Sequence, residues 1–456
     1  MNTLAEFEKN DIAHSITHQG VHVWPLIKNY LPLFAEIGKE VVKKEDRGTI
    51  NILLKGLLRD AFWCVQIFRS TIWVFTNSER RYELNGKHFD RVTSGLLRFF
   101  PSYVLFENPI PKGQSPRKKL QKGEYWVGLS WLFLLQKAIM ACMGRLQIKN
   151  LHLLDQELGV HKTKIQSLVK RYHAEYLLYR FLFNFRKPKA VFVVCYYTKY
   201  GLIRACKKRG IPVFELQHGL VSPGHRAYYF SRDFDSDYFP DYFLSYGAYS
   251  SKVVSQGHVV PKSHTLDYGY TFLDEVAGRL SMSQELKAIK NRFKKVVCIT
   301  GQLPVTDVPL LEMISEVHSL FPEMCFIYKP RFEDSTAISP TSGNFIQHFE
   351  LNTYELLKYC DYHLTVYSTC AMECLALGTP NIAVDIKGYY TQFLKPMLND
   401  NPFNFTVSDI QGLIQILKKL EKEAFDPNVV KESIRPIFSE MISSEAFFEF
   451  FDEVVK

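Results

Sequence analysis

Hydroxyl-bearing residues follow a predicted strand in the second half of the chain, where they could hold a phosphate. His363 to Tyr367 alternates β-branched, aromatic and apolar residues, Ser368 and Thr369 come next, and a helix pattern from Ala371 to Leu377 ends at Gly378. Ser368 is a preferred N-cap residue, so the first helical N–H groups, the positive dipole end and both hydroxyls are expected to face one ligand. Taken alone, the pattern describes an ordinary capped helix better than a phosphate site.

Other polar groups also follow predicted strands, and together they favour a ligand site over an ordinary capped helix. Glu373, about one and a half turns into the same helix, is an acceptor suited to ribose or sugar hydroxyls. Four more polar clusters each follow a predicted strand: Asn77 to Arg81 after a strand at Thr71 to Thr76, Gln217 to Gly219, Gly301 with Gln302, and Lys329 to Arg331. Ligands of parallel sheets bind beyond the carboxyl ends of the strands. The shared position predicts one ligand cleft between two sheets.

The elements that must position these residues alternate between strand and helix from Lys189 onward. The predicted strands after that point are Ala190 to Tyr197, Ile211 to Gln217, Asp241 to Tyr246, Thr265 to Tyr268, Val296 to Thr300, Cys325 to Tyr328, His363 to Tyr367 and, as the last, Asn381 to Val384. Such alternation predicts parallel sheets with helical crossovers. We expect an α/β protein of two Rossmann-like domains facing each other across a cleft. Residues 1–280 form the first domain with a helical N-terminal region, 281–435 the second, and 436–456 a helix packing back on the first.

Composition favours a folded protein with an anionic partner. The chain has 456 residues, 46% of them hydrophobic, and a formal charge of +9, with basic clusters at Lys112 to Lys122 and Lys162 to Arg171. Nucleotide phosphates, a lipid headgroup surface or nucleic acid would suit these clusters, although for each cluster alone a solvated face is the simpler explanation. Because the clusters lack glycine–aromatic interleaving and no nucleic-acid-binding module is visible, we expect no nucleic-acid partner.

One apolar segment, Tyr125 to Gly144, approaches the length of a membrane span. Gln136 and Lys137 fall at its centre and would be costly in hydrocarbon, so we expect a buried helix. A helix resting on an anionic membrane surface is the alternative. The N-terminus lacks the plan of a signal peptide, which predicts a cytoplasmic protein, with peripheral contact at the inner membrane as an option.

The cysteines favour a reducing compartment. Nine are scattered along the chain without a C-x-x-C pair, which argues against a zinc site and against a disulfide scaffold. Cys195, Cys298 and Cys325 lie in apolar strand-like runs, where we expect each thiol to behave as a small buried hydrophobe.

The polar clusters together resemble a known group, the GT-B glycosyltransferases that build bacterial surface polysaccharides such as capsule, O-antigen and lipopolysaccharide, including Kdo and sialic acid transferases. The residues that carry the likeness lie between Lys189 and Asp385: Glu215 to Gly219 with His225 and Tyr228, Phe239 to Gly247, Lys329 to Arg331, Tyr367 to Thr369 with Glu373, and Leu377 to Pro380. The resemblance implies that the second domain binds the nucleotide of the donor, whereas the first supplies the acceptor site and the base.

The sequence departs from the group at one position. Relatives often have Lys-x-His-Pro where this chain has Lys329-Pro330-Arg331. Arg331 can contact a phosphate through two N–H groups but cannot serve as a proton donor. The departure favours electrostatic stabilisation of the leaving nucleotide over general-acid assistance.

Glycosyl transfer needs a base for the acceptor hydroxyl and positive charge or N–H groups for the leaving phosphate. Candidate catalytic residues are His218, Glu79 and Asp90, and each has a plain structural explanation as a strand-end histidine or a surface acid. Candidate donor-binding residues are Gly219, Gly301, Gln302, Lys329, Arg331, Ser368, Thr369 and Glu373. Asp233, Asp235 and Asp237 form D-x-D pairs in an aromatic segment, which we interpret as loop acids, so no metal ion or other cofactor is expected.

The sequence therefore predicts an inverting, metal-independent glycosyltransferase. It would move a sugar from a nucleotide donor, CMP-linked as first choice and UDP-linked as second, to a growing surface glycan or lipid-linked glycan. A sugar-nucleotide epimerase of the same architecture and a non-catalytic binding protein for polysaccharide assembly are the alternatives.

Overall fold

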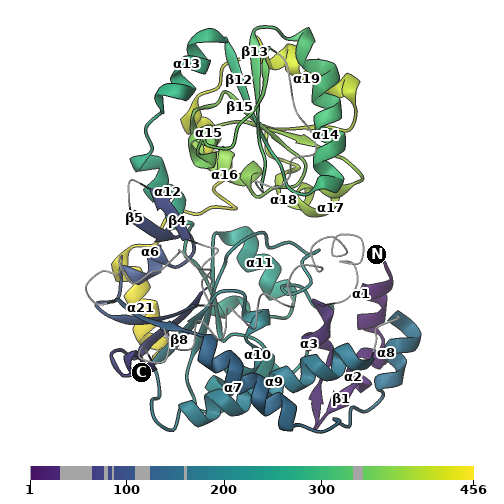
Figure 1. Cartoon of the computed structure of the whole chain (residues 1–456), viewed down its shortest axis with the longest axis vertical. Coiled ribbons are helices and arrows are strands. Elements are labelled where there is room, and N and C mark those ends of the chain that lie inside the picture. The colour runs from purple at the N-terminus through teal and green to yellow at the C-terminus, as the bar shows by residue number, and fades with distance from the viewer. Residues whose placement is uncertain are drawn as a thin grey trace. The chain divides into compact units, whose positions relative to one another are not determined.

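The computed structural model describes residues 2–30, 64–76, 81–84, 87–107, 124–158, 162–331 and 343–455. The chain divides into two α/β units, each with a core of its own (Figure 1). Met1–Tyr246, Ser250–Tyr268 and Met441–Lys456 belong to the first unit, and Gly247–Tyr249 with Gly269–Glu440 to the second. The chain thus enters the second unit at Gly269 and returns to the first for its last segment.

The first unit is built on a seven-stranded sheet with the order β11-β10-β9-β8-β3-β6-β7, and every neighbouring pair is parallel. All five residues of β3 are buried, as expected for a strand covered on both faces. The strands are β3 Ile72–Thr76, β6 Tyr103–Glu107, β7 Glu124–Gly128, β8 Ala190–Val193, β9 Val213–Leu216, β10 Tyr242–Ser245 and β11 Thr265–Asp267. Two small antiparallel pairs accompany the sheet: β1 Thr17–His18 with β2 Val21–His22, and β4 Arg81–Leu84 with β5 Lys87–Asp90.

Helices cover both faces of this sheet. On one face α21 packs Phe447 and Phe451 into the core formed by β3, β8 and β9. On the other face Tyr179 and Phe183, at the end of α9, pack against rings of β3. The helices of the unit are α1 Asn2–Lys9, α2 Asp11–Ser15, α3 Trp24–Lys28, α6 Ser94–Leu97, α7 Ser130–Cys142, α8 Leu151–Leu158, α9 Lys162–Leu182, α10 Tyr200–Lys207, α11 Ala248–Gln256 and α21 Ser444–Val454.

The segment Tyr125 to Gly144 is not one helix, and that prediction was wrong. Its first residues form strand β7, which pairs with β6, and α7 begins only at Ser130. A short apolar run has no periodicity that distinguishes a buried strand from a buried helix. Among the helices of the described residues, none is long and apolar enough to cross a membrane.

The second unit is built on a six-stranded parallel sheet with the order β14-β13-β12-β15-β16-β17. Figure 1 shows α13 and α15 on one face and α14 and α19 on the other. The strands are β12 Lys295–Thr300, β13 Met324–Lys329, β14 Phe345–Gln347, β15 Tyr362–Thr365, β16 Asn381–Val384 and β17 Asn404–Val407. The helices are α12 Thr271–Arg279, α13 Gln284–Arg292, α14 Pro304–Val317, α15 Thr353–Tyr359, α16 Cys370–Leu377, α17 Tyr389–Phe393, α18 Lys395–Leu398, α19 Ile410–Leu420 and α20 Pro427–Glu432.

Two strands of this sheet were not predicted, and Asn381 to Val384 is not the last strand. Strand β17 follows it and pairs with it residue by residue, while the three-residue strand β14 forms the other edge. Asn404 opens β17 with a buried amide, so the strand lacks the apolar start that periodicity would detect.

A buried polar ladder crosses the sheet and explains that amide. Thr300 Oγ1 lies 2.8 Å from His363 Nε2, His363 Nδ1 lies 2.7 Å from Asn381 Oδ1, and Asn381 Nδ2 donates to Asn404 Oδ1 at 2.6 Å. Each group meets the hydrogen-bonding need of the next across β12, β15, β16 and β17. Burial lowers the pKa of His363 to about 4, so the ladder contains a neutral imidazole.

Candidate active site

The strongest cluster of reactive side chains lies at the end of β9 in the first unit. His218 follows this strand, and its Nδ1 lies 3.6 Å from Oε1 of the fully buried Glu215 and 3.3 Å from the hydroxyl of Tyr228. Tyr228 donates to the same carboxylate at 2.6 Å. The other carboxylate oxygen accepts the Tyr196 N–H at 3.0 Å. Glu215 therefore fixes both the imidazole and the backbone that follows β8.

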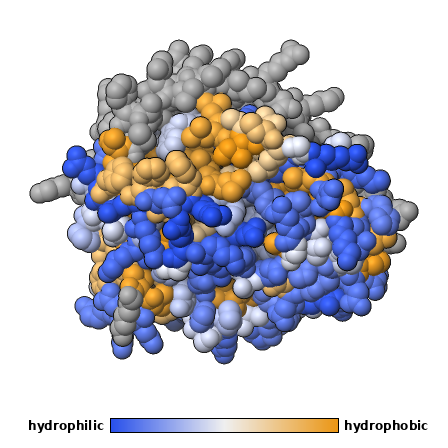
Figure 2. Space-filling model, turned by 90° about the horizontal axis from the view of Figure 1, so that it is seen from below, coloured by the Kyte–Doolittle hydropathy of each residue, from blue (hydrophilic) through white to orange (hydrophobic). Residues whose placement is uncertain are grey.

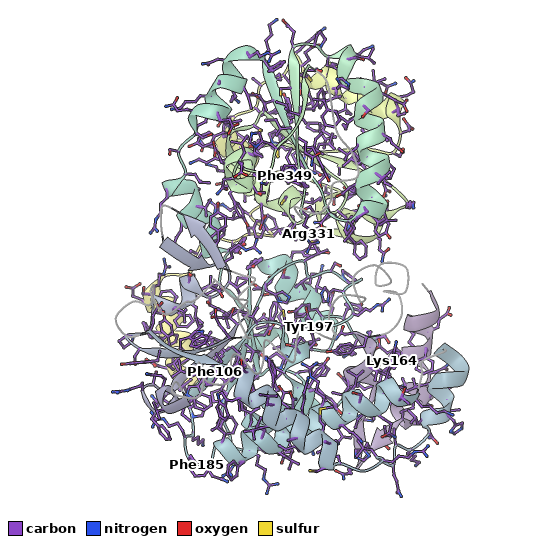
Figure 3. All side chains as sticks on the ribbon, viewed as in Figure 1. Phe106, Lys164, Phe185, Tyr197, Arg331 and Phe349 are labelled. Atoms are coloured by element: carbon purple, nitrogen blue, oxygen red, sulfur yellow. The ribbon has the colours of Figure 1, made fainter. Side chains whose placement is uncertain are left out.

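The opposite nitrogen of His218 faces two groups from the segment after β8. His218 Nε2 lies 3.1 Å from Cys195 Sγ and 3.2 Å from the hydroxyl of Tyr197, which Figure 3 labels. Cys195 has the left-handed backbone angles φ 62° and ψ 61°, which a residue with a side chain seldom adopts. It is partly exposed, so its expected role as a buried hydrophobe was wrong, whereas Cys298 and Cys325 are buried.

Hydrogen-bond complementarity assigns the tautomer of His218. Because Tyr228 gives its proton to Glu215, its oxygen is left as an acceptor for the N–H on Nδ1 of His218. The proton on Nδ1 leaves the lone pair on Nε2, directed at Cys195 and Tyr197. His218 is thus oriented to accept a proton through Nε2, as a general base must.

Gln217 and Gly219 shape the turn that carries His218. Gln217 Nε2 donates to the Gly219 carbonyl at 2.9 Å, and its Oε1 accepts the Tyr246 N–H at 2.6 Å. Gly219 has open space where a side chain would be, so its assignment to the donor stays a prediction. His225 lies in the next loop, where burial lowers its pKa to about 4 and its Nδ1 accepts the Ala227 N–H.

The two acidic candidates are placed differently. Glu79 lies outside the described residues. Asp90 ends β5, and its carboxylate accepts the Thr76 hydroxyl at 2.6 Å and the N–H groups of Val92 and Thr93, each at 2.9 Å. These hydrogen bonds show that Asp90 stabilises the backbone of the turn that begins at Val92. Its role as a base stays a prediction, and the geometry favours His218.

In the second unit, Gly301 and Gln302 follow β12 and are held by a buried acid, Asp307, in the first turn of α14. The Gln302 N–H lies 2.8 and 3.0 Å from the two oxygens of Asp307, and Tyr328 donates to one of them at 3.1 Å. Burial raises the pKa of Asp307. A Cβ on Gly301 would lie 2.6 Å from both Asp307 Oδ2 and the Tyr328 hydroxyl, so a larger residue would have to displace these side chains.

The basic candidates follow β13. Arg331 is exposed and donates from Nη1 to Oε1 of Gln302 at 2.6 Å, which brings together two of the predicted residues. Lys329 donates to the carbonyl of Phe349, a residue that Figure 3 labels together with Arg331. The guanidinium is therefore the more accessible of the two positive charges, in keeping with a phosphate contact.

Ser368 and Thr369 follow β15, and α16 begins at Cys370, with Thr369 in the cap position. Ser368 is only 4% exposed, and its hydroxyl accepts the Cys370 N–H at 3.2 Å. Thr369 is half-buried and offers the more accessible hydroxyl. Gly378 ends the helix as expected, with φ at +94°.

Glu373 lies on the buried side of α16. It is 6% exposed, and its carboxylate lies 3.4 Å from the hydroxyl of Tyr354 on α15. Its proposed contact with ribose stays a prediction.

The ends of β12, β13 and β15 meet at Tyr367. Its phenol is influenced by the charges of Asp307 and Arg331 and by a hydrogen bond with Thr306, while burial raises its pKa to about 12. The strand-end rule thus brings residues from three predicted clusters together within this unit. The same rule would have pointed to Cys195 and Tyr197, and an acid in the first turn after Gly301 would have pointed to Asp307.

The D-x-D acids contact separate basic groups. Asp233 lies 2.8 Å from His258, Asp235 2.7 Å from His22, and Asp237 2.9 Å from Lys208. Within the described part of the chain, no group of three or more histidines, cysteines or acids is arranged to hold a metal ion. Metal independence stays a prediction.

No protein-family model and no curated protein sequence matches the chain. Solved structures do. The S. aureus MnaA–UDP co-structure is 10% identical and has a TM-score of 0.53 over 84% of this chain and 97% of its own. A UDP-N-acetylglucosamine 2-epimerase is 14% identical, with a TM-score of 0.53 over 84% and 94%. The glycotransferase of kitacinnamycin is 11% identical, with a TM-score of 0.50 over 84% and 99%.

The fold is GT-B. The two parallel sheets with their helices confirm the predicted class of two Rossmann-like α/β units. The structural similarity supports the GT-B fold. Because the sequence identities are this low, the reaction must be argued from the residues of the chain itself. The reported neighbours include a UDP-N-acetylglucosamine 2-epimerase and a glycotransferase, and these correspond to the two enzymatic alternatives that the sequence had raised.

Proposed function

We propose that this GT-B protein is an inverting glycosyltransferase that uses a nucleotide sugar. The observation that carries the proposal is the His218 cluster, in which Glu215 and Tyr228 orient an imidazole with its Nε2 lone pair directed at Cys195 and Tyr197. A base held in this way suits removal of a proton from an acceptor hydroxyl.

The proposed reaction needs a base for the acceptor and groups that stabilise the leaving nucleotide, and each unit offers residues suited to one of these roles. His218 Nε2 takes the proton of the acceptor hydroxyl, whose oxygen forms a bond to the anomeric carbon of the donor as the bond from that carbon to the phosphate oxygen breaks. The nucleotide departs as an anion. Arg331 and the Thr369 hydroxyl, beside the first N–H groups of α16, supply positive charge and hydrogen bonds for that anion.

The neighbours favour one second candidate, a sugar-nucleotide 2-epimerase. Two of the compared structures are MnaA with UDP and a UDP-N-acetylglucosamine 2-epimerase, and both cover 84% of this chain. An epimerase would use His218 to move a proton on the sugar itself and would need no acceptor. The two reactions therefore differ in whether an acceptor is consumed.

The deciding experiment measures ligand binding first and products second. Thermal shifts with CMP-, UDP-, GDP- and CDP-linked sugars identify the donor, since a ligand at 100 times its dissociation constant adds roughly 2.7 kcal/mol of stability. The sequence favoured CMP, while two of the GT-B neighbours are associated with UDP or a UDP-sugar, so both belong in the panel.

The product of the selected donor then distinguishes the candidates. We expect nucleotide release that depends on a glycan acceptor, a product with inverted anomeric configuration, and turnover that persists in EDTA. An isomerised nucleotide sugar formed without acceptor would establish the epimerase instead. Binding of a glycan without turnover of any donor would point to an assembly protein.

We further propose that the acceptor is reached at a membrane surface through α7. Leu135 on this helix is 46% exposed, and Ala138, Ala141 and Cys142 are exposed as well. A hollow of about 610 Å³ beside them is lined by basic side chains, namely Lys137, Arg145, Lys162 and Lys170. Exposed apolar residues next to positive charge suit the interface of an anionic bilayer.

Figure 2 shows the molecule from below, the direction in which α7 and α9 lie in Figure 1, and hydrophobic residues form patches bordered by hydrophilic ones on this face. The other basic cluster, Lys112 to Lys122, lies outside the described residues.

A further inference from the structure

Cys195 differs from the other thiols of the described chain in its surroundings. Cys206, Cys298, Cys325, Cys360 and Cys374 are buried, whereas Cys195 and Cys370 are partly exposed, and the sulfur of Cys195 lies 3.1 Å from a histidine nitrogen. Burial raises the pKa of the Cys206 thiol well above its usual range and that of Cys325 to about 12. Those thiols are protected from chemistry at neutral pH, because the thiolate is the reactive form.

The surroundings of Cys195 place an imidazole, backed by a carboxylate, beside its thiol. Its sulfur lies 3.1 Å from His218 Nε2, the nitrogen that carries the lone pair. Glu215 and the Tyr228 hydroxyl both lie close to the other ring nitrogen, Nδ1. The order thiol, imidazole, carboxylate is that of an activated cysteine nucleophile. The left-handed backbone at Cys195 holds the sulfur at this position, and strained residues of this kind cluster at functional sites.

We propose that Cys195 is a modification site, at which His218 activates the thiol for reaction with small disulfides. His218 Nε2 takes the proton of Cys195, and the thiolate sulfur attacks one sulfur of the disulfide. The disulfide bond breaks, and the leaving thiolate receives the proton back from His218. Cys195 is thereby oxidised to a mixed disulfide, while the other half of the small disulfide is reduced to a thiol, so atoms and electrons balance.

The modification would control the base. A group attached to Cys195 Sγ stands at His218 Nε2, the nitrogen that the proposed transferase reaction uses, so the mixed disulfide blocks proton removal until a reductant cleaves it. This consequence rests on the proposed function, whereas the reactivity of Cys195 does not.

The test compares thiols within one molecule, without any substrate. The protein is treated with iodoacetamide from pH 6 to 9, and the labelling rate of each cysteine is followed by peptide mass spectrometry. Cys142, exposed at the end of α7, is the internal reference for an ordinary thiol. At pH 6.5 we expect Cys195 to be labelled at least tenfold faster than Cys142, since an imidazole-paired thiol retains its thiolate below neutral pH. A Cys195 rate equal to or below that of Cys142 across the range would overturn the proposal.

Two variants and one reagent complete the design. His218→Asn should slow the labelling of Cys195 to the rate of Cys142, and Cys195→Ser should remove its signal. Unchanged labelling of Cys195 in His218→Asn would refute the role of the imidazole. If that variant unfolds, the pH profile of the wild-type protein decides alone. Glutathione disulfide should modify Cys195 before the other cysteines, and dithiothreitol should reverse it; modification elsewhere first would contradict the site.

Discussion

Tyr228 and His218 are linked through a hydroxyl that serves two partners at once. The Tyr228 oxygen donates its proton to Glu215 and lies 3.3 Å from His218 Nδ1 as an acceptor. This single hydroxyl joins a buried carboxylate to the imidazole and determines which of its nitrogens carries a proton. The proposals for the base and for Cys195 depend on that link.

Removal of the base should greatly slow turnover without unfolding the protein. We expect His218→Ala to lower kcat by roughly 10² to 10⁴-fold, the usual contribution of a general base, while donor affinity is kept. Initial rates and a thermal melt measure the two effects. His264→Ala, at a half-buried histidine beside β11, is the control. Full activity in His218→Ala would reduce this histidine to a structural role.

Loss of the Tyr228 hydroxyl should affect the rate and spare binding. Tyr228→Phe keeps the packed ring but removes the group that orients His218, so we expect kcat to fall about tenfold, equivalent to one hydrogen bond, with KM unchanged. The neighbouring Tyr229→Phe is the matched control. A higher KM at constant kcat would show that Tyr228 contacts substrate instead.

Donor binding should weaken when Arg331 or Glu373 is replaced. A charge-assisted hydrogen bond contributes about 1.5 to 3 kcal/mol, so Arg331→Ala and Glu373→Ala should each raise the dissociation constant of the donor roughly 10- to 100-fold. Calorimetric titration measures it. Arg292→Ala, at an exposed arginine that ends α13, controls for the loss of one charge. Unchanged affinity in both variants would remove the donor assignment from these residues.

Stability should fall in acid because of His363. Its pKa is lowered from 6.5 to about 4 by burial, so below pH 6.5 the unfolded chain binds a proton that the native ladder does not. The free energy of unfolding should lose about 3 kcal/mol from this group between pH 6.5 and 4, with no effect above pH 6.5. Urea unfolding at a series of pH values measures the slope.

A variant separates His363 from the other histidines in that experiment. His363→Gln should flatten part of the slope, whereas His318→Gln, at a partly exposed histidine of the same unit, should leave it steep. Equal slopes for the wild-type protein and His363→Gln would show that the imidazole is not the titrating group.

Membrane binding should depend on both the charge and the apolar side chains of the α7 surface. We expect cosedimentation with phosphatidylglycerol vesicles, weak binding to phosphatidylcholine vesicles, and loss of binding as salt rises. Leu135→Glu and the pair Lys137→Glu with Lys162→Glu should each reduce binding. Leu320→Glu, at an exposed leucine of the second unit, is the control. Equal binding to both lipids, or none to either, would contradict the surface.

The fold could be predicted from the sequence because strands that are buried on both faces appear as long apolar runs. Such runs alternate with helix patterns along this chain, as expected for parallel sheets. The strand that begins at Asn404 was missed because its first side chain belongs to a polar ladder, whose partners are distant in sequence. The strand at Glu124 was missed because its apolar run continues into α7.

The candidate site could be predicted in part. Strand ends pointed to His218, Gln302 and Arg331, and the structure shows that the last two are hydrogen-bonded. Sequence spacing could not show that Cys195 leaves its strand in a left-handed turn towards His218, since that contact depends on how two neighbouring strands end.

Helix α21 gives the folding of this chain an order. Phe447 and Phe451 complete the core of the first unit, yet they are synthesised after all of Gly269–Glu440, which forms the second. On the ribosome the second unit can therefore fold first. Until α21 is synthesised, one apolar face of the sheet in the first unit stays uncovered. The sheet that carries His218 is therefore the part of the nascent chain that we expect a chaperone to bind.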